Sequence, residues 1–215
     1  MKKYINIIPV TLIVMSILFS CKKSESPKVY VESIKDKTWW GTLTYTGQKT
    51  EYYSVHFNAD KSLVWSQLSG DYPGLWEIND KHLKMTFPLL KSEIDGDISK
   101  NDTLMNISDN NASVSINSGK LIANSNIVLD NTVWLGSANM TTPKVLELTF
   151  IPGSQIKINI ENSTIKTYAY TRSLSGSVFR ATITGGDVFF GVTTSASEMK
   201  GSIGKSDNPW YTVKK

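Results

Sequence analysis

The feature that most constrains this chain is a strict alternation of apolar and polar residues over short segments. Single polar residues separate Ile156, Ile158 and Ile160, and the segment from Leu83 to Phe87 repeats the pattern. A period of two residues is that of a β-strand with one buried face. The 215 residues include only 7 alanines, against 26 serines, 20 threonines and 15 asparagines, which disfavours helices and suits strands joined by polar turns. We therefore expect an all-β fold.

Turn signals divide the second half of the chain into segments of about eleven residues. Gly185-Gly186 and the segment Lys205–Pro209 are the strongest of these signals. The first half gives a similar number of segments, with its weakest pattern over residues 89–127. In the second half the expected strands cover residues 132–140, 144–151, 155–161, 164–171, 177–184, 187–193, 197–204 and 208–214.

Two parts of the chain resemble each other. The segment Asp36–Trp40 recurs as Asp130–Trp134, at an offset of 94 residues, and each copy is followed by a glycine and a hydroxyl residue. The hairpins expected at residues 53–65 and 146–158 then share one register at an offset of 93. We infer an internal repeat, with a first unit over residues 36–127 and a second over residues 128–215.

Eight short antiparallel strands with tight connections favour an up-and-down barrel or a sandwich, because both protect the edges of the sheet. We predict two tandem small antiparallel up-and-down β-barrels. The alternative is one two-sheet β-sandwich built from both repeats.

A tryptophan near the start of the first strand, with glycine and threonine beside it and hairpins after it, resembles the lipocalin-like and avidin-like small barrels. The pattern is most similar to the lipocalin-like domains found in many bacterial lipoproteins. The resemblance covers residues 36–127 and again 130–215, and it implies calycin-type barrels. No ligand-binding residue is carried over from it.

The amino terminus has the pattern of a secretory signal peptide. Lys2 and Lys3 precede a mostly apolar run from Ile5 to Phe19, which is shorter than the roughly 20 residues that a spanning helix needs. Its end, Leu18-Phe19-Ser20-Cys21, resembles the lipobox of bacterial lipoproteins. The resemblance implies cleavage after residue 20 and lipidation of Cys21, with a diacylglyceryl group on sulfur and an acyl group such as palmitate on the new amine. Cys21 is the only cysteine in the chain.

Residues 21–35 are expected to form a lipidated tether, because the stretch around Pro27 is polar and lacks an apolar period. The membrane is thus an expected partner, reached through Cys21. Lys22 does not match the acidic signal that retains lipoproteins at the inner membrane, so the outer membrane of a didermal bacterium is expected. The segment also lacks an acidic cluster for surface export, which favours a periplasm-facing position over the cell surface.

The charge pattern argues against nucleic-acid binding. The chain has 23 Lys and Arg against 19 Asp and Glu, and loss of Lys2 and Lys3 with the signal peptide leaves 21 basic residues and a net charge of +2. The basic residues are scattered among acidic ones rather than gathered on a stripe. Nucleic acid is therefore not an expected partner.

Residues that could carry chemistry are few. His56 and His82 lie on the polar side of expected strands and belong to no metal or catalytic motif. The segment Asp95–Asn101 matches a calcium loop poorly, and Glu77 and Asp97 form no recognisable catalytic pair. We expect no catalytic residue, no metal ligand and no cofactor, and hence no enzyme.

Aromatic residues are the remaining lead. We expect Trp40 and Trp134, which align in the repeat, to close the base of each barrel. An aromatic face can also stack on a sugar ring or line an apolar pocket. The candidate ligand-binding residues are Trp65, Tyr72, Trp76, Tyr168 and Tyr170.

Three classes of function remain open. The favoured one is an outer-membrane-anchored lipoprotein with a non-enzymatic binding role, for a small apolar molecule or a glycan, and it predicts a cavity. The alternative is an envelope scaffold or protein-interaction module with filled barrels, which predicts an exposed apolar patch. A polymer hydrolase, the least favoured, predicts a cleft with two carboxylates of different pKa.

Overall fold

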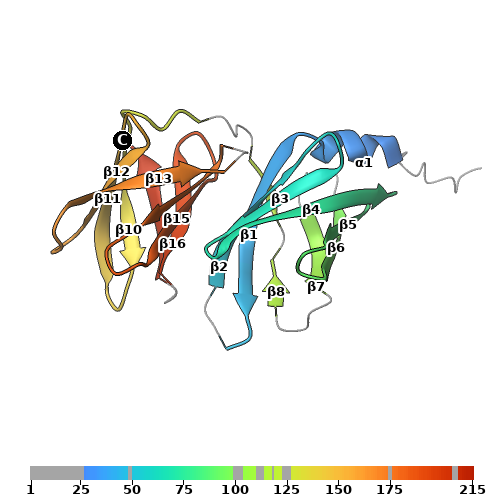
Figure 1. The fold of residues 1–215 in the computed structure, drawn as a ribbon, viewed down its shortest axis with the longest axis horizontal. Coiled ribbons are helices and arrows are strands. Elements are labelled where there is room, and N and C mark those ends of the chain that lie inside the picture. Colours follow the sequence, from blue (N-terminus) through green and yellow to red (C-terminus); the bar gives the residue numbers. More distant parts are fainter. Residues whose placement is uncertain are drawn as a thin grey trace, which may run out of the picture.

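The computed structural model describes residues 27–47, 50–98, 104–109, 114–117, 119–122, 127–173, 176–204 and 208–215. The expected signal peptide, the lipobox and Cys21 lie outside these residues. The described part consists of β-strands and one short helix, arranged as two β units side by side (Figure 1). Within it, no helix has the length and apolar character needed to span a membrane.

The first unit is a curled antiparallel sheet with the order β7-β6-β5-β4-β3-β2-β1-β8, and β9 also pairs with β1. Strands β7 and β8 lie next to each other, but no ladder of paired residues joins them in the described part of the chain. This unit is therefore a barrel-like sheet that is left open between β7 and β8. Its strands are β1 (Lys37–Tyr45), β2 (Thr50–Phe57), β3 (Ser62–Gln67), β4 (Gly70–Asn79), β5 (His82–Phe87), β6 (Ser92–Ile98), β7 (Leu104–Asp109), β8 (Val114–Ile116) and β9 (Lys120–Leu121).

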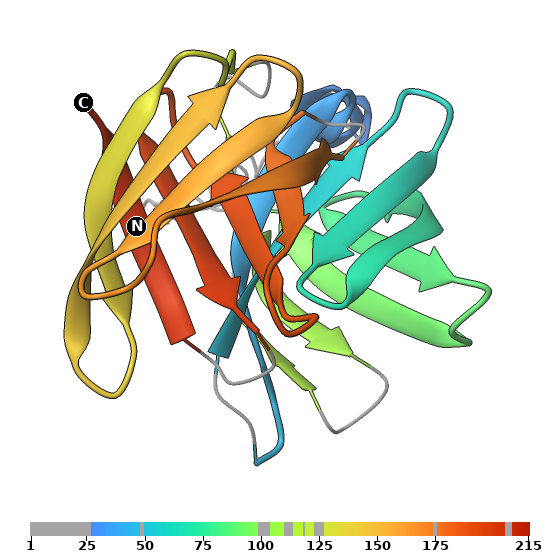
Figure 2. The same ribbon diagram turned by 60° about the vertical axis from the view of Figure 1, so that its left-hand side comes forward.

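The second unit is a closed antiparallel barrel, in which β10 pairs with both β11 and β17 (Figure 2). The prediction of an all-β fold with barrel units is confirmed. The strands of this barrel follow the expected segments to within two residues at every end. They are β10 (Val133–Asn139), β11 (Pro143–Ile151), β12 (Gln155–Ile160), β13 (Lys166–Arg172), β14 (Val178–Thr182), β15 (Val188–Thr193), β16 (Glu198–Ile203) and β17 (Asn208–Lys214).

Both units begin with the same local structure. Asp36 and Asn131, just before β1 and β10, adopt a left-handed backbone with φ of 56° and 61°. Their N–H groups donate to the carbonyl oxygens of Phe57 and Phe150, at 2.7 and 3.0 Å. Aspartate and asparagine are among the residues that tolerate this conformation best. The internal repeat is thus visible in the backbone as well as in the sequence.

The alignment of the repeat needs one correction. Trp39 pairs with Val55 and Trp134 pairs with Leu148, and Val55 and Leu148 are equivalent hairpin positions. Trp39, not Trp40, therefore corresponds to Trp134, and both are fully buried in their cores. The expectation that Trp40 closes the base of the first barrel is wrong. A shift of one residue along a strand moves a side chain to the opposite face.

Each unit has its own apolar core, and a third cluster lies between them. Because each unit has a separate sheet and a separate core, the alternative of one two-sheet sandwich is wrong. The third cluster, which we call the seam, includes Trp40 and Tyr52 at its margin. Its buried members are Leu68 and Ile122 from the first unit and Val178, Phe190 and Val192 from the second.

Helix α1 (Pro27–Ile34) occupies part of the expected tether. Proline suits the first turn of a helix, where its missing N–H group costs nothing. Ile34 is fully buried in the core of the first unit, and Val31 packs against that core. Val31 and Ile34 are three positions apart and share one face of the helix. The part of the expected tether from residue 27 onward therefore belongs to the first unit.

Candidate functional site

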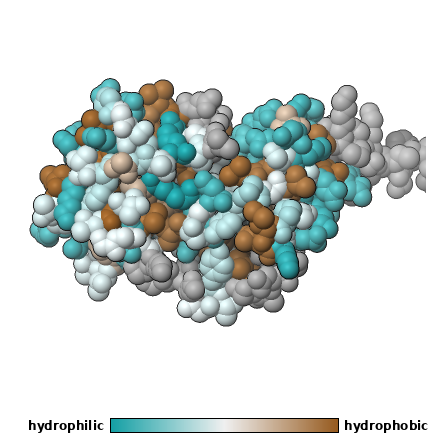
Figure 3. All heavy atoms as spheres, in the orientation of Figure 1, coloured by the Kyte–Doolittle hydropathy of each residue, from teal (hydrophilic) through white to brown (hydrophobic). Residues whose placement is uncertain are grey.

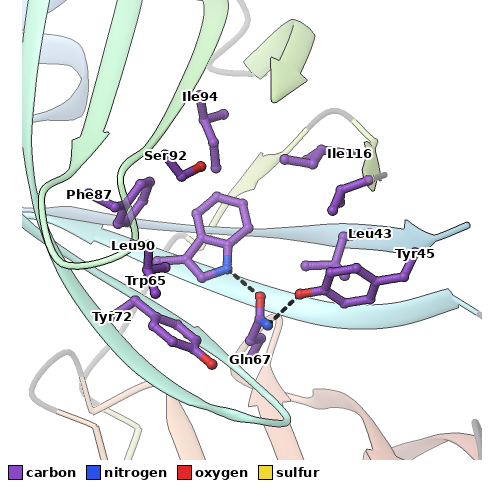
Figure 4. Close-up of a pocket in the computed structure, with 11 residues that line it drawn as sticks. Leu43, Tyr45, Trp65, Gln67, Tyr72, Phe87, Leu90, Ser92, Ile94 and Ile116 are labelled. Atoms are coloured by element: carbon purple, nitrogen blue, oxygen red, sulfur yellow. Dashed lines mark hydrogen bonds between the residues drawn. The ribbon is translucent and has the colours of Figure 1, made fainter. Parts of the chain in front are cut away.

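A pocket of about 320 Å³ opens at one end of the first unit, and we call it the mouth pocket (Figure 4). Helix α1 packs on β1 and β4 at the other end (Figure 1). Strand β1 spans about 20 Å from Trp39 to Tyr45, which lines the pocket. The helix therefore covers one end of the unit, and the pocket opens at the other. The pocket is lined by Leu43, Tyr45, Trp65, Gln67, Tyr72, Phe87, Leu90, Ser92, Ile94, Val114 and Ile116.

Trp65 forms the centre of the pocket wall and is held from two sides. Its ring stacks on Tyr53, with centroids 4.1 Å apart and planes at 12°, and meets Phe87 edge to face at 6.2 Å. Such aromatic pairs fix ring orientation beyond what area burial alone gives. The indole is only 4% exposed. It therefore forms a rigid part of the wall that exists before any ligand arrives.

A chain of hydrogen bonds runs along one side of the pocket, and we call it the polar relay. The indole N–H of Trp65 donates to Oε1 of Gln67 at 2.9 Å. The Gln67 amide nitrogen donates to the hydroxyl of Tyr45 at 2.7 Å and to Oγ of Ser69 at 2.8 Å. The Tyr72 hydroxyl donates to the same Ser69 oxygen at 2.9 Å. The relay fixes the amide of Gln67 in one orientation on this side of the pocket.

The second barrel holds this side of the pocket through Arg180 on β14. The Arg180 guanidinium donates to the carbonyl oxygen of Gln67, at 3.1 and 2.7 Å, and to that of Gly70 at 2.8 Å. It also forms an ion pair with Asp71 at 2.8 Å and lies over the ring of Phe190. The turn between β3 and β4 is thus clamped from the seam. A planar guanidinium presents five donors in a fixed fork and can span acceptors that lie apart, whereas a lysine ammonium is a compact point charge.

Tyr53 forms a second layer beneath Trp65. Its hydroxyl donates to the carbonyl oxygen of Asn117 at 3.0 Å, and burial raises the pKa of Tyr53 far above its usual range. The phenol therefore remains neutral at any physiological pH. A Cβ at Gly41 would lie 2.6 Å from this ring, so glycine is required for the tyrosine to fit.

The structure brings only two of the five candidate ligand-binding residues together, Trp65 and Tyr72. Trp76 lies in the core of the first unit, where it packs edge to face with Phe57. Its indole N–H donates to the carbonyl oxygen of Asn58 at 3.1 Å, and the amine of Lys61 lies over its ring. It is therefore a packing residue.

The other two candidates belong to the second barrel. Tyr170 packs edge to face on Phe150 and Phe179 in the core. Tyr168 lines a separate hollow of about 230 Å³ at one end of the barrel, and its hydroxyl is 3.1 Å from that of Thr184. Phe189 and Trp210, stacked at 4.8 Å, fill the barrel interior. The second barrel therefore has a packed centre and a shallow end.

Gln67 is the pocket residue that the sequence analysis missed. It lies two positions after Trp65 on β3, and residues two apart on a strand share a face. A glutamine on the same face as a buried tryptophan was therefore a signal in the sequence. Ile94 and Ile116, on the opposite wall, come from the region of weakest pattern, where no strand face could be assigned.

The charged residues considered for chemistry lie on the outer face of the first unit. His82 lies between Asp97 and Asp95, at 3.2 and 3.3 Å, and Lys81 forms an ion pair with Asp97 at 2.7 Å. Asp95 and Asp97 belong to strand β6 rather than to a loop, which does not match a calcium-binding turn. Across the described ranges, no group of three or more His, Cys, Asp or Glu side chains is placed to hold a metal ion.

The comparisons with known proteins add no relative, since no family model, no curated protein and no solved structure matches the chain. Figure 3 shows hydrophobic side chains interspersed with hydrophilic ones on one face of the molecule. The case for a function therefore depends on the mouth pocket itself.

Proposed function

We propose that the protein is a lipoprotein, anchored in the outer membrane through Cys21, that binds a small molecule in the mouth pocket without chemical conversion. The observation that carries the proposal is the preformed pocket, whose volume of about 320 Å³ lies within the range of small-molecule sites. Its wall combines an immobilised indole with aliphatic side chains and one fixed amide. Such a combination binds and orients a ligand.

The position of α1 supports a tethered binding protein. The described chain enters the first unit through α1, which packs on β1 and β4, whereas the mouth pocket is lined by the far end of β1 at Leu43 and Tyr45. A lipid anchor at Cys21 would therefore leave the mouth open toward the periplasm, the location that we propose. Two or three acyl chains anchor a protein stably, whereas one binds only marginally.

A binding role is favoured over catalysis because the described lining of the mouth pocket contains no carboxylate, histidine or cysteine. These side chains are among those that most often act as general acids and bases within hydrogen-bond reach of a substrate. The hydroxyl and amide groups present are joined in the polar relay, where they can hold a ligand in one orientation.

The proposal is tested by titrating the mature protein with the neutral fluorophore N-phenylnaphthylamine, whose emission rises in an apolar site. We expect saturable binding that Trp65→Leu weakens by about tenfold or more, because this change removes the central wall. The matched control is Tyr168→Leu, in the hollow of the second barrel, which should leave the binding unchanged. No saturable binding, or equal loss in both variants, would contradict the proposal.

A further inference from the structure

The described lining of the mouth pocket contains no charged side chain, although 20% of the residues in the chain are charged. The charged neighbours are directed elsewhere. Asp71 is paired with Arg180 at the seam, and Glu93 is paired with Lys84 at 3.0 Å on the outer face of β5 and β6. The described lining of the pocket thus supplies neither a cation to an anion nor an anion to a cation.

This lack of charge has a consequence for the ligand. A charged group that enters an apolar site loses its hydration and needs an opposite charge or several hydrogen bonds in return. The relay offers hydrogen bonds of neutral groups only. An uncharged ligand avoids this cost, because its polar group needs only one or two neutral partners.

The pocket is also divided into an apolar and a polar side. In Figure 4, Ile94 and Ile116 lie on one side of the Trp65 ring, while Gln67 and Tyr72 lie on the other. Leu43 and Val114 add aliphatic surface to the lining. A ligand that uses both sides has an apolar body and a hydrogen-bonding group at one end.

We propose that the mouth pocket selects uncharged amphipathic molecules, whose apolar body lies against the aliphatic side and whose hydrogen-bonding group meets the relay at Gln67 and Tyr72. The inference rests on the proposed binding function and defines its ligand class. The pocket should bind neutral compounds such as alcohols, amides and arylamines more tightly than fatty carboxylates and sulfonates of similar size.

A matched pair of fluorophores tests the selectivity. N-phenylnaphthylamine and anilinonaphthalenesulfonate share one ring skeleton, and only the second carries a negative charge. For each compound, the difference in fluorescence between the mature protein and its Trp65→Leu variant measures binding in the mouth pocket. We expect the neutral compound to bind about tenfold tighter than the sulfonate, or more. Equal or tighter binding of the sulfonate would overturn the selectivity but leave a binding pocket, whereas failure of both compounds would contradict the proposed function itself.

A gain of charge provides the second arm of the test. Ser92 lines the pocket at the start of β6, so Ser92→Lys places a cation there, and Ser92→Met adds a neutral side chain of similar length. We expect the lysine variant to shift the ratio of the two affinities by about tenfold or more toward the sulfonate. The methionine variant should keep the preference for the neutral compound. An unchanged ratio in a folded lysine variant, checked by circular dichroism, would overturn the proposal.

Discussion

At the scale of single residues, two adjacent tryptophans show where sequence reasoning is limited. Trp39 and Trp40 necessarily point to opposite faces of β1, so one of them had to be buried. The sequence could not tell which, because the repeat aligns at offsets of 94 and 95 almost equally well. The register of β1 with β2 decides for Trp39 and leaves Trp40 at the seam, under the amine of Lys200.

We predict that Arg180 positions the relay. Arg180→Lys keeps the charge but cannot reach Gln67, Gly70 and Asp71 together, so buried carbonyls lose their donors. The expected result is a loss of about 1–3 kcal/mol in the free energy of unfolding and weaker N-phenylnaphthylamine binding. The control is Arg172→Met, because Arg172 binds the carbonyl of Ile127 away from the pocket. This control should lower stability without changing affinity; unchanged affinity in Arg180→Lys would contradict the positioning role.

A second residue-scale prediction concerns pH. Burial lowers the pKa of His56, against smaller opposing effects of Asp36 and Asn58. Below a pH of about 6.5 the unfolded chain takes up a proton that the folded chain resists, so stability falls as the pH drops through this range. Chemical denaturation between pH 7.5 and 5.5 should show this decline, and His56→Gln should reduce it. The control His82→Gln removes a histidine from the exposed outer face. A decline that persists fully in His56→Gln would show that His56 is not its source.

At the scale of elements, the strands of the second barrel could be predicted because their alternation is regular and their turns contain glycine, asparagine or proline. The opening between β7 and β8 in the first unit could not be predicted, because residues 89–127 show little alternation of apolar and polar residues. Helix α1 was missed for another reason. Among its side chains that the structure describes, Ile34 is buried, Val31 is partly buried and Glu32 is exposed, so the segment is short and mixed in character and resembles a tether in sequence.

We predict that α1 stabilises the first unit through Ile34. The side chain is fully buried, and Ile34→Ala should lower the free energy of unfolding by about 2–5 kcal/mol, the range for large-to-small core substitutions. The matched control is Glu32→Ala, on the exposed face of the same helix. Denaturant unfolding measures both variants. Equal effects of the two changes would mean that the helix does not pack on the core in solution.

At the scale of the whole molecule, the two units act as one support for the mouth pocket. The seam buries apolar residues from both units, and Arg180 reaches across it to the turn beside Gln67. The sequence predicted two barrel units and a binding role. It gave no sign that the second, packed barrel would hold the polar side of a pocket in the first, because that contact joins residues more than a hundred positions apart.

The anchoring proposal makes a prediction at the same scale. Replacing Cys21 by alanine removes the only thiol in the chain and with it the acceptor of the lipid. We expect Cys21→Ala to move the protein from the membrane fraction to the soluble fraction and to abolish labelling with a palmitate analogue. The control Ser24→Ala should leave both unchanged. Membrane retention and labelling in Cys21→Ala would contradict the anchor.

A crystal structure of the mature protein soaked with N-phenylnaphthylamine tests most directly whether the mouth pocket is the ligand site. We expect density for the fluorophore beside Trp65, with its N–H group toward Gln67 and its rings toward Ile116. Density in the hollow beside Tyr168, or a mouth pocket filled by the protein's own side chains, would contradict it.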